Sequence, residues 1–154
     1  MKAGNLFSAF FQLKNMFRAK DLEEINHFSK NTLLEHLSIT FIEMGDDFIK
    51  AKMPVVPKTH QPLGYLHGGA TLALAESLGS IASFLLIDPT QYNVFGLEIN
   101  ANHIRSKKDG YVIATARPIH IGTKTHIWDI RIEDEEQKLI SIVRLTNIVV
   151  DARK

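Results

Sequence analysis

The stretch that most constrains the fold covers residues 61–86, which read QPLGYLHGGATLALAESLGSIASFLL. Pro62 and Gly64 mark a turn at its start, because both residue types interrupt regular structure. No further proline occurs until Pro89, and the residues between are mostly small or good helix formers. The pattern therefore predicts one helix over residues 68–87, about 30 Å long.

The predicted helix has an apolar face and a second face where a single acid lies among small residues. The apolar face comprises Leu74, Leu78, Ile81 and Leu85. The second face comprises Gly69, Ala73, Glu76, Ser80 and Ser83. Small neighbours leave space for a backbone or a ligand beside the carboxylate, and glutamate is rarely buried without a partner. Glu76 is thus either solvated at an open edge or placed for catalysis, and the apolar character of this helix favours catalysis.

His67, Gly68 and Gly69 stand where the helix begins. The first N–H groups of a helix lack partners within it and carry partial positive charge. Two glycines let a ligand approach the main chain, so this step is suited to a polarised carbonyl or an oxyanion. The alternative is a glycine-rich turn that serves only tight packing.

Three motifs occur in order along the chain: QPLGYLHGGATLALAESLGS, GLEINANHIRS and HIGTKTHIW. Together they resemble the hotdog-fold acyl-CoA thioesterases, and most of all the group that hydrolyses aromatic acyl-CoAs such as 1,4-dihydroxy-2-naphthoyl-CoA. The resemblance covers roughly residues 21–150. It is specific for fold and reaction class, and less specific for the acyl group. It implies an α+β hotdog fold, in which an antiparallel sheet wraps around one long central helix.

The resemblance also implies catalytic roles for five residues. Gly68 would supply the backbone N–H that stabilises the oxyanion, and Glu76 would act as nucleophile or general base. Gln61 and His67 would orient the carbonyl or the water, and Ser80 would hold the water or the carboxylate. Two plainer interpretations stay open, in which the Gln61 amide bonds its own turn and the His67 ring bonds backbone at the helix start.

The family's coenzyme A site maps onto two polar stretches. The first comprises Gly96, Asn102, His103, Arg105 and Ser106, with Lys107 and Lys108 following; the second comprises His120, Gly122, Thr123, Lys124 and Thr125. Arginine and lysine pair with phosphate, which suits a ligand that carries several. The alternative is a pair of solvated turns that happen to be basic.

The rest of the chain alternates with the period of two that is typical of strands. We expect one or two short helices over 21–36, and strands near 39–43, 48–53, 95–103, 111–118, 128–132 and 139–150. Asp109-Gly110 predicts a hairpin turn between the third and fourth of these strands. Short turns join antiparallel neighbours, so periodicity alone indicates an α+β arrangement of one sheet on one long helix.

Composition narrows the possible functions. A chain of 154 residues fits one domain, and its net charge of +1 gives no indication of nucleic-acid binding. It contains no cysteine, which excludes a disulfide framework and a thiol nucleophile and fits a reducing compartment, so we expect the cytoplasm. No apolar run is long enough to span a membrane. The histidines show no metal-ligand spacing, so we expect neither metal nor cofactor, with coenzyme A as part of the substrate.

Residues 1–20 differ from the predicted domain over 21–150. They carry four basic residues and no acid, with Leu6, Phe10, Leu13 and Phe17 at helical spacing. This pattern predicts an amphipathic extension. We favour its packing on the domain or on another subunit over a helix that contacts a membrane surface or binds a partner.

Three functional hypotheses follow. The favoured one is an acyl-CoA thioesterase acting on an aromatic or bicyclic acyl group. The alternatives are a non-catalytic acyl-CoA-binding module and a hotdog dehydratase. Because related proteins pair subunits into one continuous sheet with sites built from two chains, we expect a homo-oligomer, either a dimer or a tetramer built from dimers.

Overall fold

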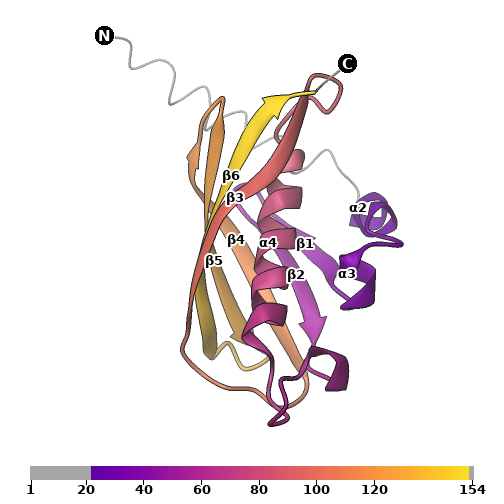
Figure 1. Ribbon diagram of the computed structural model, residues 1–154, viewed down its shortest axis with the longest axis vertical. Helices are drawn as coiled ribbons and strands as arrows, with labels where there is room; N and C mark the ends of the chain where they lie inside the picture. Colours follow the sequence, from indigo (N-terminus) through magenta and orange to yellow (C-terminus); the bar gives the residue numbers. More distant parts are fainter. Residues whose placement is uncertain (1–21, 153–154) are drawn as a thin grey trace.

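The computed structural model describes residues 22–152, and the predicted extension over residues 1–20 lies outside them (Figure 1). In chain order the elements are α2 (Leu22–Phe28), α3 (Leu33–His36), β1 (Thr40–Met44), β2 (Ile49–Pro54), the 3-10 turn η2 (Pro57–Thr59), α4 (Gly68–Phe84), β3 (Tyr92–His103), β4 (Tyr111–Ile121), β5 (Thr125–Asp134) and β6 (Leu139–Asp151). The predicted alternation of two strands, one long helix and four strands is confirmed.

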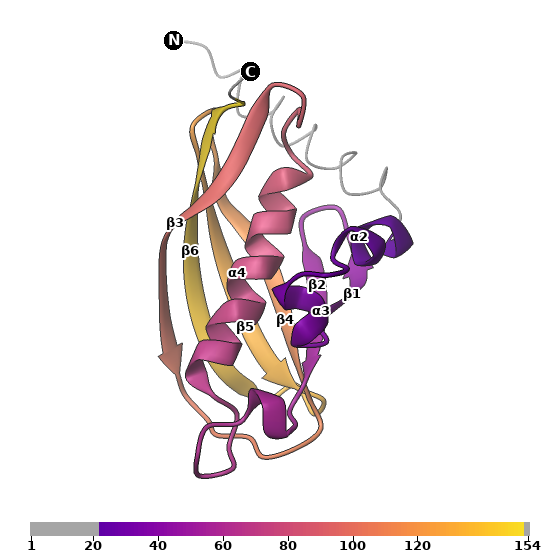
Figure 2. The ribbon, with the colours of Figure 1, turned by 45° about the vertical axis from the view of Figure 1, so that its right-hand side comes forward.

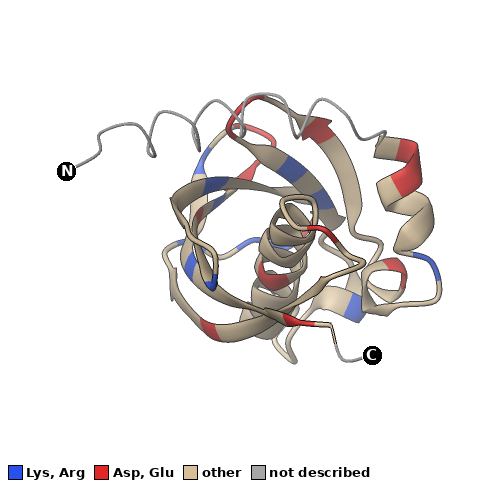
Figure 3. Ribbon diagram, turned by 90° about the horizontal axis from the view of Figure 1, so that it is seen from above, with Lys and Arg blue, Asp and Glu red and all other residues tan. Residues whose placement is uncertain are grey.

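The strands form one six-stranded antiparallel sheet in the order β1-β2-β4-β5-β6-β3. The sheet curves around α4, which lies along its concave face (Figure 2). Viewed along the helix, the strands enclose α4 on three sides (Figure 3). This is the predicted hotdog arrangement, in which the apolar face of one helix is buried against one sheet.

The short helix α2 covers the β1 end of the sheet beside α4. The side-chain oxygen of Asn26 accepts a hydrogen bond from the Phe41 N–H at 2.9 Å, and its amide nitrogen donates to the Phe41 carbonyl at 3.0 Å. The rings of Phe28 and Phe84 stack with centroids 5.6 Å apart. These contacts hold α2 against both β1 and the C-terminal end of α4.

Helix α4 ends at Phe84, three residues before the predicted end. The N–H of Leu86 donates to the carbonyl of Ser83 at 3.1 Å, which tightens the last turn to a 3-10 geometry. Pro89 disfavours a helical conformation at the residue before it, so the helix cannot continue into this segment.

The predicted faces of α4 were partly wrong. Ser83, which we placed beside Glu76, is fully buried, whereas Ile81 is only half-buried. Ser83 accepts hydrogen bonds from the Trp128 indole N–H and from the Asn147 amide nitrogen, both at 2.8 Å. Its hydroxyl is satisfied by two polar partners inside the core, and the apolar spacing alone gives no sign of such partners.

The predicted hairpin between β3 and β4 is wrong. A turn does occur, since Gly110 has a φ of 73°, but β3 pairs with β6 at the sheet edge and β4 lies between β2 and β5. Residues 104–110 cross the end of the sheet instead. The Ile104 N–H donates to the Ile140 carbonyl at 2.8 Å, and the Lys107 carbonyl accepts from the Leu66 N–H at 2.8 Å. Long-range pairing thus decides the partner of β3, and a local turn signal cannot report it.

A β-bulge between Gly96 and Glu98 breaks the strict alternation expected for β3. Gly96 pairs with Asn147 and Ile99 with Leu145, so inward-facing positions are even before the bulge and odd after it. Phe95 and Leu97 are therefore left 57% and 60% exposed on the free edge of the sheet. This edge strand presents apolar side chains and unpaired main-chain groups together.

Candidate active site

The N-terminus of α4 is built around His67. The Nδ1 atom of His67 accepts a hydrogen bond from the Gly69 N–H at 2.8 Å, and its carbonyl accepts from the Thr71 N–H at 3.1 Å. The ring is therefore a neutral N-cap with its proton on Nε2, which is the plainer interpretation of this residue. Among the described residues, the Gly68 N–H has no acceptor. That N–H is the candidate oxyanion donor.

A cavity of about 560 Å³ opens beside this helix start. Of the residues predicted for the site, it brings together Gln61, Gly68, His103, Arg105 and Ser106. Its walls come from the turn before α4, the end of β3, the connection that follows β3 and the start of β6. A helix N-terminus with a free N–H and an arginine at one cavity suits a ligand that has both a carbonyl and phosphates.

Gly68 leaves room for the ring of His103. A Cβ atom at position 68 would lie 2.7 Å from His103 Nε2, which is closer than real contacts allow. The other ring nitrogen, Nδ1, is hydrogen-bonded to the Ser141 hydroxyl at 2.8 Å, and the two residues are cross-strand partners. Sequence reasoning missed Ser141, because its proximity depends on the β3–β6 pairing.

The side chain of Gln61 serves its own turn and also lines the cavity. Its Oε1 atom accepts a hydrogen bond from the Leu63 N–H, and its main-chain carbonyl accepts from the Gly64 N–H at 2.9 Å. Because only the amide oxygen can accept from an N–H, the NH₂ group is the end that is left to donate to a ligand. The Gln61 amide therefore bonds its own turn, as the plainer interpretation predicts, and its NH₂ group can still orient a ligand carbonyl in the cavity.

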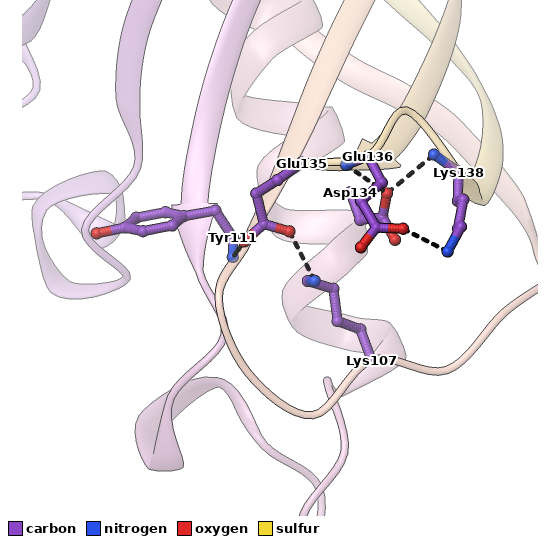
Figure 4. A network of polar contacts seen from close by, with 6 residues as sticks. All are labelled: Lys107, Tyr111, Asp134, Glu135, Glu136 and Lys138. Carbon is purple, nitrogen blue, oxygen red and sulfur yellow. Dashed lines mark hydrogen bonds and ion pairs between the residues drawn. The ribbon is translucent and has the colours of Figure 1, made fainter.

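Lys107 is engaged within the protein (Figure 4). Its Nζ atom lies 2.7 Å from Glu135 Oε2, and the other oxygen of Glu135 accepts from the Tyr111 N–H at 2.5 Å. The hydrogen bond from Lys107 holds the pKa of the Glu135 carboxyl below its usual range. Lys108 lies over the Tyr65 ring, with its Nζ atom 4.8 Å from the centroid. Arg105 and Lys108 therefore suit phosphate binding better than Lys107 does.

The same Figure 4 shows how the β5–β6 turn is held. One oxygen of Asp134 accepts hydrogen bonds from the N–H groups of Glu136 and Lys138, both at 2.9 Å. The side chains of Glu136 and Lys138 form an ion pair on the surface. The turn is thus a rigid support, from which Glu135 reaches the 104–110 connection.

Glu76 lies outside the cavity, on an exposed part of α4. A Cβ atom at Gly96 would lie 2.6 Å from Glu76 Oε1, so the carboxylate occupies the space that this glycine leaves on β3. Glu76 follows Gly68 by eight residues, about 12 Å along the helix axis. Ser80 lies one turn farther on and is half-buried. Within one chain, the predicted acid and the predicted oxyanion donor do not face one another.

The second predicted coenzyme A stretch lies at the opposite end of the sheet. It surrounds the β4–β5 turn, where the Lys124 carbonyl accepts from the Val149 N–H at 2.8 Å. From Tyr111 to Ile121, β4 extends about 33 Å, so this turn is far from the cavity at the strand's other end. Asn102 pairs with Ile142 on the outward face of the sheet and does not line the cavity.

A buried histidine lies near the second stretch. His126 is 3% exposed, and burial lowers its pKa, with a smaller lowering from the nearby His120. It is the cross-strand partner of Asn147, and among the described residues neither His126 Nδ1 nor Asn147 Oδ1 has a hydrogen-bond partner. Residues 22–152 contain no group of three or more His, Asp or Glu side chains placed to hold a metal ion.

The described part of the chain also contains no helix long and apolar enough to cross a membrane. Comparisons with known proteins agree with the fold. Residues 63–141 match the family model of the thioesterase superfamily. The 1,4-dihydroxy-2-naphthoyl-CoA hydrolase of Escherichia coli K12 is 43% identical over 129 residues, which cover 84% of this chain and 94% of the relative.

Two solved structures extend this similarity. A mutant of thioesterase PA1618 from Pseudomonas aeruginosa superposes with a TM-score of 0.85 at 49% identity, covering 86% of this chain and 96% of that one. Thioesterase HI1161 from Haemophilus influenzae gives 0.84 at 42% identity, covering 88% and 94%. The chain therefore belongs to the thioesterase superfamily and is a hotdog-fold thioester hydrolase.

Proposed function

We propose that this protein hydrolyses an aromatic or bicyclic acyl-CoA, such as 1,4-dihydroxy-2-naphthoyl-CoA, to the free acid and coenzyme A. The observation that carries the proposal is the unpartnered Gly68 N–H at a cavity that also holds Arg105. The acyl group is suggested by the relative that is named for this substrate. No resident cofactor is needed, because coenzyme A enters as part of the substrate.

The site residues divide the reaction between them. The thioester carbonyl accepts a hydrogen bond from the Gly68 N–H, with the Gln61 NH₂ group as a second donor, so that negative charge developing on the oxygen is stabilised. The carboxylate of Glu76 either attacks the carbonyl carbon or removes a proton from an attacking water held by Ser80. If Glu76 attacks, a C–O bond forms and the C–S bond breaks, which leaves a mixed anhydride on Glu76; water then hydrolyses this anhydride to the free acid and restores the carboxylate. If water attacks, its oxygen forms the C–O bond as the C–S bond breaks. In either route the coenzyme A thiolate takes up a proton released by the attacking water.

Pairing of two chains at the open sheet edge would bring Glu76 to the thioester. Apolar side chains on the free edge of β3 suit antiparallel pairing with β3 of a second copy, because two-fold pairing buries the same surface from both chains. Such pairing places the end of one β3 beside the start of the other. The partner's Glu76 then approaches Gly68, and the partner's Lys124 approaches Arg105. The proposed unit is a dimer or a tetramer built from dimers.

Thiol release from a panel of acyl-CoAs tests the proposal. Glu76→Gln and Glu76→Ala should lower kcat on the best substrate by about 100-fold or more. Glu43→Gln, which changes an exposed acid on β1, should match the wild type. If both Glu76 variants also match the wild type, the assignment of Glu76 is wrong. Binding of acyl-CoA without turnover would favour the non-catalytic module, and an unsaturated thioester as product would favour the dehydratase.

A further inference from the structure

Three buried polar side chains join α4 to the middle of the sheet. Ser83, Trp128 and Asn147 have no exposed surface. The Asn147 amide nitrogen donates to the Ser83 hydroxyl at 2.8 Å and to the Gly79 carbonyl at 3.0 Å. The orientation of the amide is fixed, because a carbonyl can only accept.

Apolar packing alone does not require this polar cluster. Burying polar groups is costly, and apolar residues of the same shape could fill the space at less expense of stability. The hydrogen bonds fix the position of α4 along its axis and its rotation about that axis, because only one combination of the two satisfies them. Gly79 strengthens this restriction, because a Cβ atom there would lie 2.4 Å from Leu145 Cδ2. The backbone of α4 therefore lies directly on β6 at this point.

The same part of the sheet also receives the proposed catalytic acid. Asn147 on β6 and Gly96 on β3 are direct cross-strand partners, and Glu76 Oε1 lies in the space left by Gly96. Glu76 precedes Gly79 by three residues, within one helical turn. A small shift or rotation of α4 at Gly79 would thus move the carboxylate relative to β3.

We infer that Asn147, together with Ser83, is a positioning residue that fixes the Glu76 carboxylate above Gly96. This inference rests on the proposed role of Glu76 in catalysis. Asn147 does not contact the substrate in this scheme; it holds the helix from which the acid projects. The expected consequence of its loss is a carboxylate that is correctly ionised but displaced, which lowers kcat rather than substrate affinity.

Kinetics of Asn147→Ala and Ser83→Ala test the inference. Each should lower kcat about 10- to 100-fold, with KM changed by less than about twofold. Val143→Ala is the matched control, because Val143 is equally buried on the inward face of β6 but lies four residues from Asn147. This control should lose stability while keeping kcat. Wild-type kcat in both test variants, or an equal loss of kcat in the control, would overturn the inference.

A double substitution shows whether the effect passes through Glu76. In a Glu76→Gln background, Asn147→Ala should cause no further loss of kcat. The glutamine at position 76 is inactive whether it is displaced or correctly placed. A full, additive loss would overturn the positioning role while leaving the proposed function intact. If Glu76→Gln alone keeps wild-type activity, the proposed function fails first, and the two failures are distinguishable.

Fluorescence reports whether the core itself has changed. Trp128 is the single tryptophan of the chain, and its indole N–H donates to Ser83. Ser83→Ala should shift its emission to shorter wavelength, because the indole loses its hydrogen-bond acceptor. Asn147→Ala retains that bond and should leave the emission unchanged. A shifted emission in Asn147→Ala would show general disruption of the core and would contradict a positioning role.

Discussion

Two glycines leave space for specific side chains at the site. The ring of His103 lies where a Cβ of residue 68 would be, and the carboxylate of Glu76 lies where a Cβ of residue 96 would be. In each case the space is taken by a polar group that lies at or near the helix–sheet boundary. A single methyl group should therefore alter catalysis more than it alters folding.

Gly96→Ala tests this directly. The added Cβ would lie 2.6 Å from Glu76 Oε1, so the carboxylate must move, and we expect kcat to fall about 10- to 100-fold. The substitution suits a strand, because alanine restricts the unfolded chain more than glycine does, so the midpoint of urea unfolding should change little. Gly64→Ala is the control. No atom would lie within 4 Å of a Cβ at position 64, but φ there is 79°, so this substitution should lower stability. Unchanged kcat in Gly96→Ala would contradict the placement of Glu76.

His126 should make stability fall below neutral pH. Burial lowers the pKa of His126 in the folded state. The same side chain therefore binds a proton more readily in the unfolded chain, where its pKa is near 6.5. As the pH falls through 6.5, protonation of this histidine in the unfolded chain lowers the free energy of unfolding. This loss of stability is complete once the pH is below the folded-state pKa. Urea unfolding between pH 8 and pH 5 measures this effect. The loss of stability from pH 8 to pH 5 should be smaller in His126→Gln than in the wild type. It should be the same as in the wild type in His27→Gln, which alters an exposed histidine on α2. An equal loss in all three proteins would contradict the role of His126.

At the scale of the elements, the sequence predicted most of the fold and less of the site. The long helix and six strands follow from periodicity, since α4 and its neighbours have clear apolar patterns. The partner of β3, the bulge beside Gly96 and the burial of Ser83 could not be predicted, because each depends on contacts between residues distant in the sequence. His103 was recognised as a site residue, but Ser141, which bonds its ring, was not.

The ion pair between Lys107 and Glu135 should matter because it joins two elements. It holds the 104–110 connection, which lines the cavity, against the β5–β6 turn. Glu135→Gln should destabilise the protein at pH 7 by at most about 1 kcal/mol, because the carboxylate is solvent-exposed. The pKa of Glu135 is lowered in the folded state, so the difference from wild type should disappear as the pH falls through the carboxyl range.

Thermal unfolding from pH 7 to pH 3 measures this contribution. Glu136→Gln is the matched control, because Glu136 is exposed on the same turn and forms a surface ion pair with Lys138 of that turn. The control should stay close to wild type at every pH. A Glu135→Gln protein as stable as wild type at pH 7 would show that the ion pair does not hold the connection.

At the scale of the whole molecule, the parts of the proposed site are separated within one chain. The cavity lies at one end of the sheet and the β4–β5 turn at the other, while Glu76 lies between them beside the free edge of β3. Two-fold pairing at this edge would bring opposite ends of the two chains together. Activity should therefore depend on the edge itself, although Phe95 and Leu97 do not line the cavity beside Gly68.

Leu97→Lys tests this dependence. Leu97 is 60% exposed at the bulge of β3, so a lysine there should fold normally while placing a charged side chain on the edge through which the two copies would pair. Light scattering should show a smaller species than wild type, and kcat/KM should fall at protein concentrations where the variant is monomeric. Leu33→Lys, which changes a residue 55% exposed on α3, should leave both size and activity unchanged. A Leu97→Lys protein that is monomeric yet fully active would show that one chain completes the site alone, and the partner's Glu76 would then have no part in the reaction.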